Sequence, residues 1–344
     1  MSQKPDKRMG WEVAHDLERE KASILQRIVP EWRQVKAAVG AMSVFFVVFL
    51  LGCWLAANSV RTPDNQVMID LGWAGTQEWG LIWSVLLLAL VFEFMDATAG
   101  MGFGTALTPI LLVMGFDPLQ IVPVVLIQQT VAGLVGAFLH REFQNVEWSF
   151  KPLSETVRLC MIIAIAGSVL TLAATIGIYA VFDVPVLWIK LYVALLLLGM
   201  GAVSLVQARR ERPYRPNLLI LFGGVAGFNK GVGGGGYGPV VTIGGLLAGV
   251  PVKSMLAVTA LSEGVVCLVA VLAWFAMAAS GIAVDYVLLP SVMLASMVSA
   301  VLAPYLTRVF PERLWQIVVP AYCLVVVGIT FWKMWPELST VFGG

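Results

Sequence analysis

Long apolar segments separated by short polar breaks make up most of the sequence after residue 36. Most of them reach the roughly 20 apolar residues that a helix needs to cross the hydrocarbon core of a bilayer. A spanning β-barrel would show short alternating strands instead, so continuous apolar runs indicate helices. The sequence therefore predicts an all-α polytopic membrane protein with segments at about 37–57, 79–114, 118–140, 156–182, 186–207, 217–249, 252–280, 284–306 and 312–332.

The composition excludes most other classes of protein. Hydrophobic residues make up 59% of the chain and charged residues 12%, about half the charged fraction of ordinary soluble domains. A net charge of +1 provides no field that would attract nucleic acid. The four cysteines lie in apolar segments without CxxC spacing, and no catalytic triad or HExxH motif occurs. We therefore expect no enzyme, no cofactor, no metal site and no nucleic-acid partner.

The N-terminal region differs from the rest of the chain. Residues 1–36 hold 14 of the 43 charged residues, and their apolar residues recur at helical spacing. This pattern predicts an amphipathic segment on the cytoplasmic surface of the membrane. Residues 37–57 then form an extra transmembrane helix.

Two of the apolar segments are overlong and are interrupted by glycines. The interruptions are Gly100-Met-Gly-Phe-Gly104 and Gly231-Val-Gly-Gly-Gly-Gly236, and a proline follows each of them. These features recur about 131 residues apart, which indicates an internal duplication. The sequence thus predicts two repeats of four segments, at 79–207 and 217–332, joined by a basic cytoplasmic linker at 208–216.

The positions of Lys and Arg test whether the two broken segments cross the membrane. Full crossings would place 12 basic residues inside and 9 outside, whereas two re-entrant hairpins place 18 inside and 3 outside. The positive-inside rule favours the hairpins. Each repeat then changes side an odd number of times, so the two repeats are inverted, as in many secondary transporters. We expect a multi-pass protein of the bacterial inner membrane with a cytoplasmic N-terminus.

Broken helices leave backbone N–H groups unpaired at ends that carry a partial positive charge, so two such ends can hold a small anion. An alternative is that the glycines only allow close helix packing, because Gly223, Gly227, Gly231 and Gly235 recur every four residues. Both interpretations can hold together. The predicted substrate-binding residues are Gly100, Gly102, Gly104, Thr105, Gln128, Gln129, Asn229, Lys230, Gly233, Gly234, Gly235, Gly236 and Ser262.

Four ionisable residues are expected inside the membrane: Glu93, Asp96, Lys230 and Glu263. A charge at that depth costs at least about 2.5–3.5 kcal/mol on insertion scales, so such residues usually have a function. One hypothesis is a structural pair, such as Lys230 with Asp96. The other is that Lys230 helps to hold the anion while Glu93, Asp96 and Glu263 handle protons or gate access. In the duplication, Gln128 and Gln129 correspond to Ser262 and Glu263.

With these motifs, the sequence resembles the sulfite exporter TauE/SafE family, also called the toluene sulfonate uptake permeases. The motifs that carry the resemblance run from Gly100 through Pro109 to Pro118 and from Gly231 through Pro239 to Pro251, and the likeness covers about 79–332. The first motif has fewer glycines than is usual in the family, and 1–57 departs from the compact family pattern. The resemblance implies transport of small sulfur-containing or carboxylate anions, often export of sulfite or sulfonates.

The sequence thus predicts a secondary transporter for a small anion, with export favoured because expelling a monovalent anion from a negative interior gains about 2.3 kcal/mol per 100 mV. The alternatives are an anion channel, a proton-coupled uptake permease and, more distantly, a membrane-anchored signalling or assembly protein. The expected partners are the anionic substrate and the lipid bilayer, and a homodimer stays an open alternative.

Overall fold

The computed structural model describes residues 28–59, 81–100, 103–178, 214–282 and 284–309, with isolated positions between 182 and 202 and between 321 and 339. The named elements of these ranges are all helices, and five of them are long and apolar enough to cross a membrane. The predicted all-α architecture with helices long enough to span a membrane is therefore confirmed for the described residues. The five helices are α3 (Trp32–Asn58), α6 (Pro118–Glu142), α7 (Glu155–Ile176), α11 (Val252–Ala279) and α12 (Leu289–Val309).

Local sequence signals set where these helices begin. The helix predicted at 37–57 starts earlier, at Trp32, because Glu31 and Gln34 form a capping box. Asp117 and Gln120 form a second capping box at the start of α6. The helices predicted at 186–207 and 312–332, the basic stretch 208–213 and residues 1–27 of the amphipathic segment lie outside the residues described in full, so these stay predictions.

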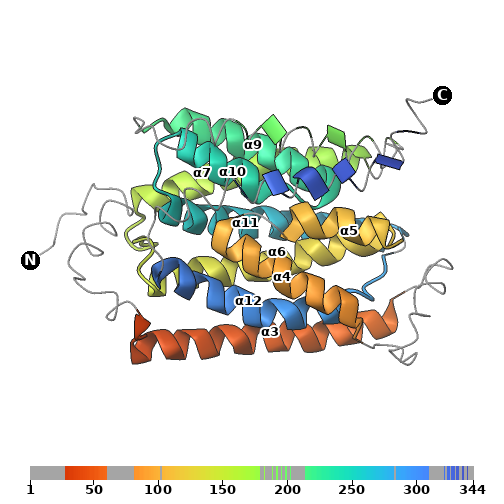
Figure 1. The fold of residues 1–344 in the computed structure, drawn as a ribbon, viewed down its shortest axis with the longest axis horizontal. Helices are drawn as coiled ribbons and strands as arrows, with labels where there is room; N and C mark the ends of the chain where they lie inside the picture. Colours follow the sequence, from red (N-terminus) through yellow and green to blue (C-terminus); the bar gives the residue numbers. More distant parts are fainter. Residues whose placement is uncertain are drawn as a thin grey trace, which may run out of the picture.

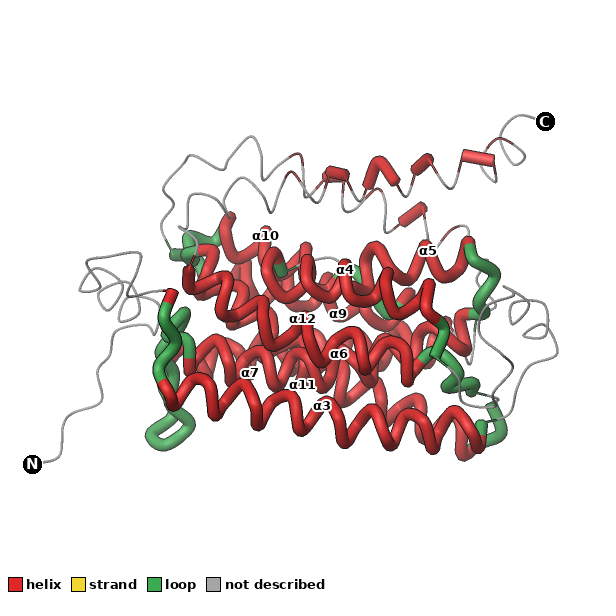
Figure 2. Tube along the Cα trace, turned by 60° about the horizontal axis from the view of Figure 1, so that its bottom comes forward, coloured by secondary structure: helices red, strands yellow, loops and turns green. Residues whose placement is uncertain are grey.

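The five long helices run lengthwise through the bundle, so that each has one end at either side (Figures 1 and 2). At the Gln34 end, the Gln34 amide donates to the Glu142 carbonyl at 2.9 Å and accepts from Arg308, which joins α3, α6 and α12. At the Asp285 end, the Asp285 carboxylate accepts from Ser59 at 3.3 Å and from Gln120 at 2.9 Å. These contacts define the two ends of the molecule.

The first broken segment begins and finishes at the Asp285 end. It consists of α4 (Trp83–Ala99), a π-helical turn η2 (Phe103–Leu107) and α5 (Thr108–Val113). Just before α4, the Ile82 N–H donates to Ser291 Oγ at 2.7 Å, near the start of α12. After α5 the chain turns directly into α6, whose Gln120 contacts Asp285.

The second broken segment begins and finishes at the opposite end. It consists of α9 (Pro216–Gly233) and α10 (Tyr237–Leu247). The Arg215 N–H donates to the Ala248 carbonyl at 2.9 Å, so the end of α10 lies beside the start of α9. The following helix, α11, begins near the Gln34 end, where Ser254 Oγ donates to the Asn145 carbonyl in the loop after α6 at 3.4 Å.

Corresponding elements of the two segments recur at a constant spacing. Helices α6 and α11 begin at Pro118 and Val252, which are 134 residues apart. The same spacing separates Gly100 from Gly234, which end α4 and α9 in the left-handed conformation with φ of 71° and 69°. The spacing is therefore 134 rather than the 131 estimated from the glycine runs. The difference arises because Gly231 is still part of α9, and the break begins only at Gly234.

Neighbouring helices come from different halves of the sequence. Helix α7 packs along α9, and α12 packs along α4, while α6 crosses α11. At this crossing a Cβ on Gly133 would lie 2.7 Å from the Ala260 carbonyl oxygen and from Gly264 N. Only glycine therefore allows α6 and α11 to approach so closely.

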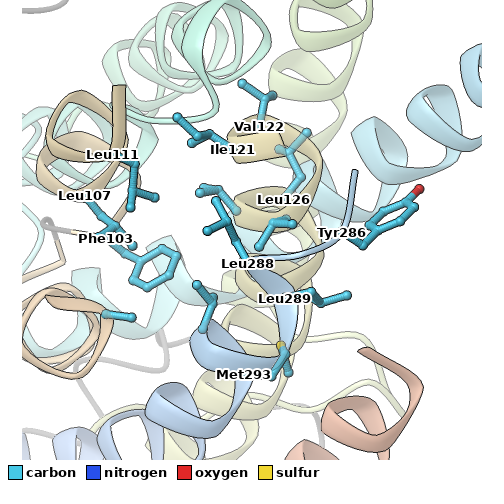
Figure 3. Close-up of a cluster of buried hydrophobic side chains, with 14 of the residues drawn as sticks. Phe103, Leu107, Leu111, Ile121, Val122, Leu126, Tyr286, Leu288, Leu289 and Met293 are labelled. Atoms are coloured by element: carbon cyan, nitrogen blue, oxygen red, sulfur yellow. The ribbon is translucent and has the colours of Figure 1, made fainter. Parts of the chain in front are cut away.

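Buried apolar side chains fix the first broken segment against its neighbours (Figure 3). Phe103, Leu107 and Leu111 from η2 and α5 are fully buried, and they pack in one cluster with side chains of α6 and α12. The residues labelled from those helices and from the turn before α12 are Ile121, Val122, Leu126, Tyr286, Leu288, Leu289 and Met293.

The glycine stripe of α9 packs against α7. A Cβ on Gly223 would lie 2.6 Å from Ile163 Cγ2, and one on Gly227 would overlap the backbone of Gly167. Thr171 Oγ1 donates to the Gly227 carbonyl at 2.7 Å. The packing interpretation of the stripe therefore holds within α9.

We expect Gly227→Ala to destabilise the protein, because the added methyl group would separate α9 from α7, and overpacking typically costs about 1–3 kcal/mol. Gly40→Ala is the matched control, since a Cβ there meets nothing within 4 Å. The control should be neutral or slightly stabilising, because alanine favours helices. Thermal unfolding of the purified variants in detergent measures both effects. Equal melting temperatures would contradict the close packing.

Candidate functional site

The two helix breaks meet in the interior of the bundle. A Cβ on Gly104 would lie 2.6 Å from the Gly234 carbonyl oxygen and 2.7 Å from Gly235 Cα, so the two backbones are in direct contact. Gly235, the last residue of the predicted stripe, thus contacts the other break and not α7. Thr105 is buried beside this contact, whereas Gly102 lies outside the described residues.

An unpaired amide lies beside the start of α10. Asn229 is fully buried, and neither of its side-chain polar atoms has a hydrogen-bond partner among the described residues. A Cβ on Gly236, the N-cap of α10, would lie 3.4 Å from Asn229 Nδ2, and no side chain caps this helix. Buried polar groups are almost always hydrogen-bonded. An unpaired donor next to unpaired helix N–H groups is therefore an arrangement suited to a small anion.

Lys230 is fully buried in an ion pair with Glu263. Its Nζ donates to Glu263 Oε1 at 2.7 Å and to Gln129 Oε1 at 3.3 Å. Gln129 in turn donates to Asp96 Oδ2 at 3.1 Å. The hypothesis that Lys230 pairs with Asp96 is therefore wrong. Glu263 contacts Lys230 directly, and Gln129 lies between Lys230 and Asp96.

A second glutamine extends this network to Glu93. The Gln128 side-chain amide donates to Glu93 Oε2 at 2.7 Å and to Ser296 Oγ at 2.8 Å. Its carbonyl oxygen accepts from Gln129 at 3.1 Å. A chain of buried hydrogen bonds therefore connects Glu93 to Glu263 and joins helices α4, α6, α9, α11 and α12.

The network contains two pairs at corresponding positions. Asp96 and Lys230 are 134 residues apart, and each accepts, through its carbonyl oxygen, the N–H of the left-handed glycine that ends its helix. Gln129 and Glu263 are also 134 residues apart, on α6 and α11. Thus Asp96 with Gln129 corresponds to Lys230 with Glu263. The bond from Lys230 to Gln129 joins the two pairs.

A cavity of about 40 Å³ lies against this network. It is large enough for two or three water molecules or a small ion, since one water needs about 10–15 Å³ by this measure. Glu93, Asp96, Glu263 and Gln129 line one part of it, and His140 lies in its wall as well. Lys230 is not part of the lining.

The structure separates the predicted site residues into groups. Gly100 lines the cavity together with the carboxylates, whereas Gly233 to Gly236 lie at the meeting of the breaks. Ser262 is buried and donates to the Thr259 carbonyl of its own helix, 3.2 Å away. Ser296 and His140 are additions. Ser296 stands in a helix rich in small residues, and His140 beside Arg141 is typical of a membrane–water interface. Neither residue therefore stood out from the sequence as part of a binding site.

We expect Lys230→Met to destabilise the protein at neutral pH, because it leaves the Glu263 carboxylate buried without its partner. Breaking a buried pair in this way costs about 3–5 kcal/mol. Adding Glu263→Gln should recover much of the loss, because the double variant buries no charge at these positions. Thermal unfolding in detergent compares the variants. A double variant no more stable than Lys230→Met would contradict the pairing.

The comparisons with known proteins agree with this architecture. A family model described as sulfite exporter TauE/SafE matches residues 85–331, which include both breaks and the polar network. A Bacillus subtilis (strain 168) protein named probable membrane transporter protein YtnM is 25% identical over 259 residues, covering 72% of this chain and 82% of that protein. No solved structure matches. These matches indicate transport and give the channel alternative no support. The chain belongs to the sulfite exporter TauE/SafE family of membrane transporters.

Proposed function

We propose that this protein is a secondary transporter of a small anion in the bacterial inner membrane. The substrate class is sulfite, a sulfonate or other organosulfur anion, or a carboxylate. One observation carries the proposal: the unpaired Asn229 amide lies beside the uncapped start of α10, where the two breaks meet. Helix N-termini favour negative charge, and the amide adds a hydrogen-bond donor. The family assignment supports the same class of function.

Alternating access follows from an inverted repeat. The two broken segments open toward opposite ends of the bundle and correspond at a spacing of 134 residues, which supports re-entrant hairpins of opposite orientation. In such transporters the substrate binds where the broken helices meet, and rocking of one unit against the other exposes it to each side in turn. The N-terminus and the Gln34 end face the cytoplasm in this proposal.

The direction of transport is export if the anion moves alone, because the membrane potential drives a monovalent anion outward by about 2.3 kcal/mol per 100 mV. The second candidate is proton-coupled uptake. The observation that favours it is the lining of the cavity, where three carboxylates lie close to a single lysine.

We expect Asn229→Asp to reduce anion transport at least about tenfold, because a carboxylate at this position repels the substrate and loses the amide donor. Asn58→Asp makes the same change on an exposed surface and should leave transport intact. Flux of sulfite, methanesulfonate and acetate into proteoliposomes tests the three substrate classes. Normal transport by Asn229→Asp would place the anion elsewhere, and no flux of any of the three would overturn the proposed substrate class.

The topology can be tested with four single cysteines in a cysteine-free background. We expect Asn58→Cys and Ser280→Cys to react with a membrane-impermeant maleimide from the periplasm, and Lys151→Cys and Tyr214→Cys only from the cytoplasm. If the first segment crossed fully, positions 58 and 151 would share a side. If the second did, positions 214 and 280 would share one. Either result would contradict the hairpins.

A further inference from the structure

Two side chains stand between the cavity and the buried lysine. Glu263 and Gln129 both line the cavity, and both accept hydrogen bonds from Lys230 Nζ, at 2.7 and 3.3 Å. Lys230 itself has no exposed surface. An anion in the cavity therefore meets the Glu263 carboxylate before it can reach the ammonium group.

The charges around the cavity oppose the entry of a free anion. The titratable groups of this region come from five of the helices around it: Glu93 and Asp96 on α4, His140 on α6, Lys230 on α9, Tyr237 on α10, and Glu263 and Cys267 on α11. Among these groups three carboxylates face one ammonium. Burying a further negative charge without compensation is strongly unfavourable. An anion can therefore bind here only if a carboxylate is neutralised at the same time.

We propose that Glu263 is an internal counter-anion which the substrate replaces on Lys230, and that Glu263 takes up one proton as it is displaced. This inference rests on the proposed anion transport and names its coupling residue. The proton comes from the bulk solution through the cavity and adds to a carboxylate oxygen of Glu263, so no hydroxide is left in the cavity. The hydrogen bond from Lys230 Nζ to Glu263 breaks, and an oxygen of the anion accepts from Lys230 instead. The charge of the site is then the same before and after binding.

Glu263 fits this role better than the other two carboxylates. It is the only one of the three that Lys230 contacts directly, and its carboxylate presents the oxygen acceptors that a sulfonate or carboxylate substrate would present. Asp96 and Glu93 are each held by a glutamine amide. Protonation of either one would leave the ammonium still occupied by Glu263.

The main test compares the pH dependence of transport. One proton per anion makes the apparent affinity for methanesulfonate fall about tenfold per pH unit on the alkaline side. In Glu263→Gln the neutral amide mimics the protonated acid, so the affinity should become independent of pH. Sulfite itself also takes up protons, so its charge changes with pH. Comparing wild type with Glu263→Gln at each pH cancels this effect, because both proteins meet the same mixture of sulfite ions.

Glu147→Gln is the matched control. Glu147 lies in the loop between α6 and α7, outside the cavity, and burial raises the pKa of its carboxyl group. This variant should keep the slope of the wild type. An unchanged slope in Glu263→Gln would overturn the proposal, and so would a slope lost in Asp96→Asn but kept in Glu263→Gln.

A measurement on the unmodified protein covers the case in which Glu263→Gln does not fold. A pH-sensitive dye inside proteoliposomes should report one proton moving with each methanesulfonate or sulfite, in the same direction. Anion flux without proton movement refutes the role of Glu263 and leaves the proposed function standing. No flux of sulfite, methanesulfonate or acetate in the wild type refutes both.

Discussion

The contact between the two helix breaks determines the rest of the site. Gly104 and Gly235 approach so closely that no other residue fits at either position. This contact brings together the last turns of α4 and α9, and each of those turns carries an ionisable side chain four residues before its left-handed glycine. The close approach of the two backbones therefore brings Asp96, which is half-buried, near Lys230, which is fully buried, and their charges have to be balanced there.

Much of this arrangement could be predicted from the sequence, because its signals are local. Apolar runs long enough to span a bilayer indicated the helices, and glycine runs inside two of them indicated the breaks. The partner of Lys230 could not be predicted in the same way. Glu263 lies on α11, which is separated in sequence from Lys230 by the whole of α10. Asp96 is expected at a depth in the membrane where it could pair with Lys230 equally well. Only the packing of α11 against α6 and α9 decides between them. The predicted repeat spacing was three residues too short, because the sequence does not distinguish the glycines inside α9 from those of the break.

The correspondence between the halves also shows how they differ. An aspartate with a glutamine in the first half matches a lysine with a glutamate in the second. The duplicated positions thus keep a polar pair at the same depth while the charges are distributed unequally. In the proposed inverted repeat, the two halves exchange conformations between the inward-open and outward-open states. Unequal polar pairs would then give these two states different electrostatics. A single ammonium can then serve as the common partner of an internal and an external anion.

The packing of the helices indicates which parts can move. Helix α7 belongs to the first half of the sequence but packs on α9, and α12 belongs to the second half but packs on α4. In the proposed alternating-access mechanism, the units that rock are therefore not the two halves of the chain. They are the first hairpin with α12 and the second hairpin with α7, on either side of the crossed pair α6 and α11. Lys230 belongs to one of these units, whereas Gln129 and Glu263 belong to the crossed pair. In this proposal, movement of the second hairpin against that pair breaks the bonds of Lys230, so exchange of its carboxylate partner and change of access are the same event.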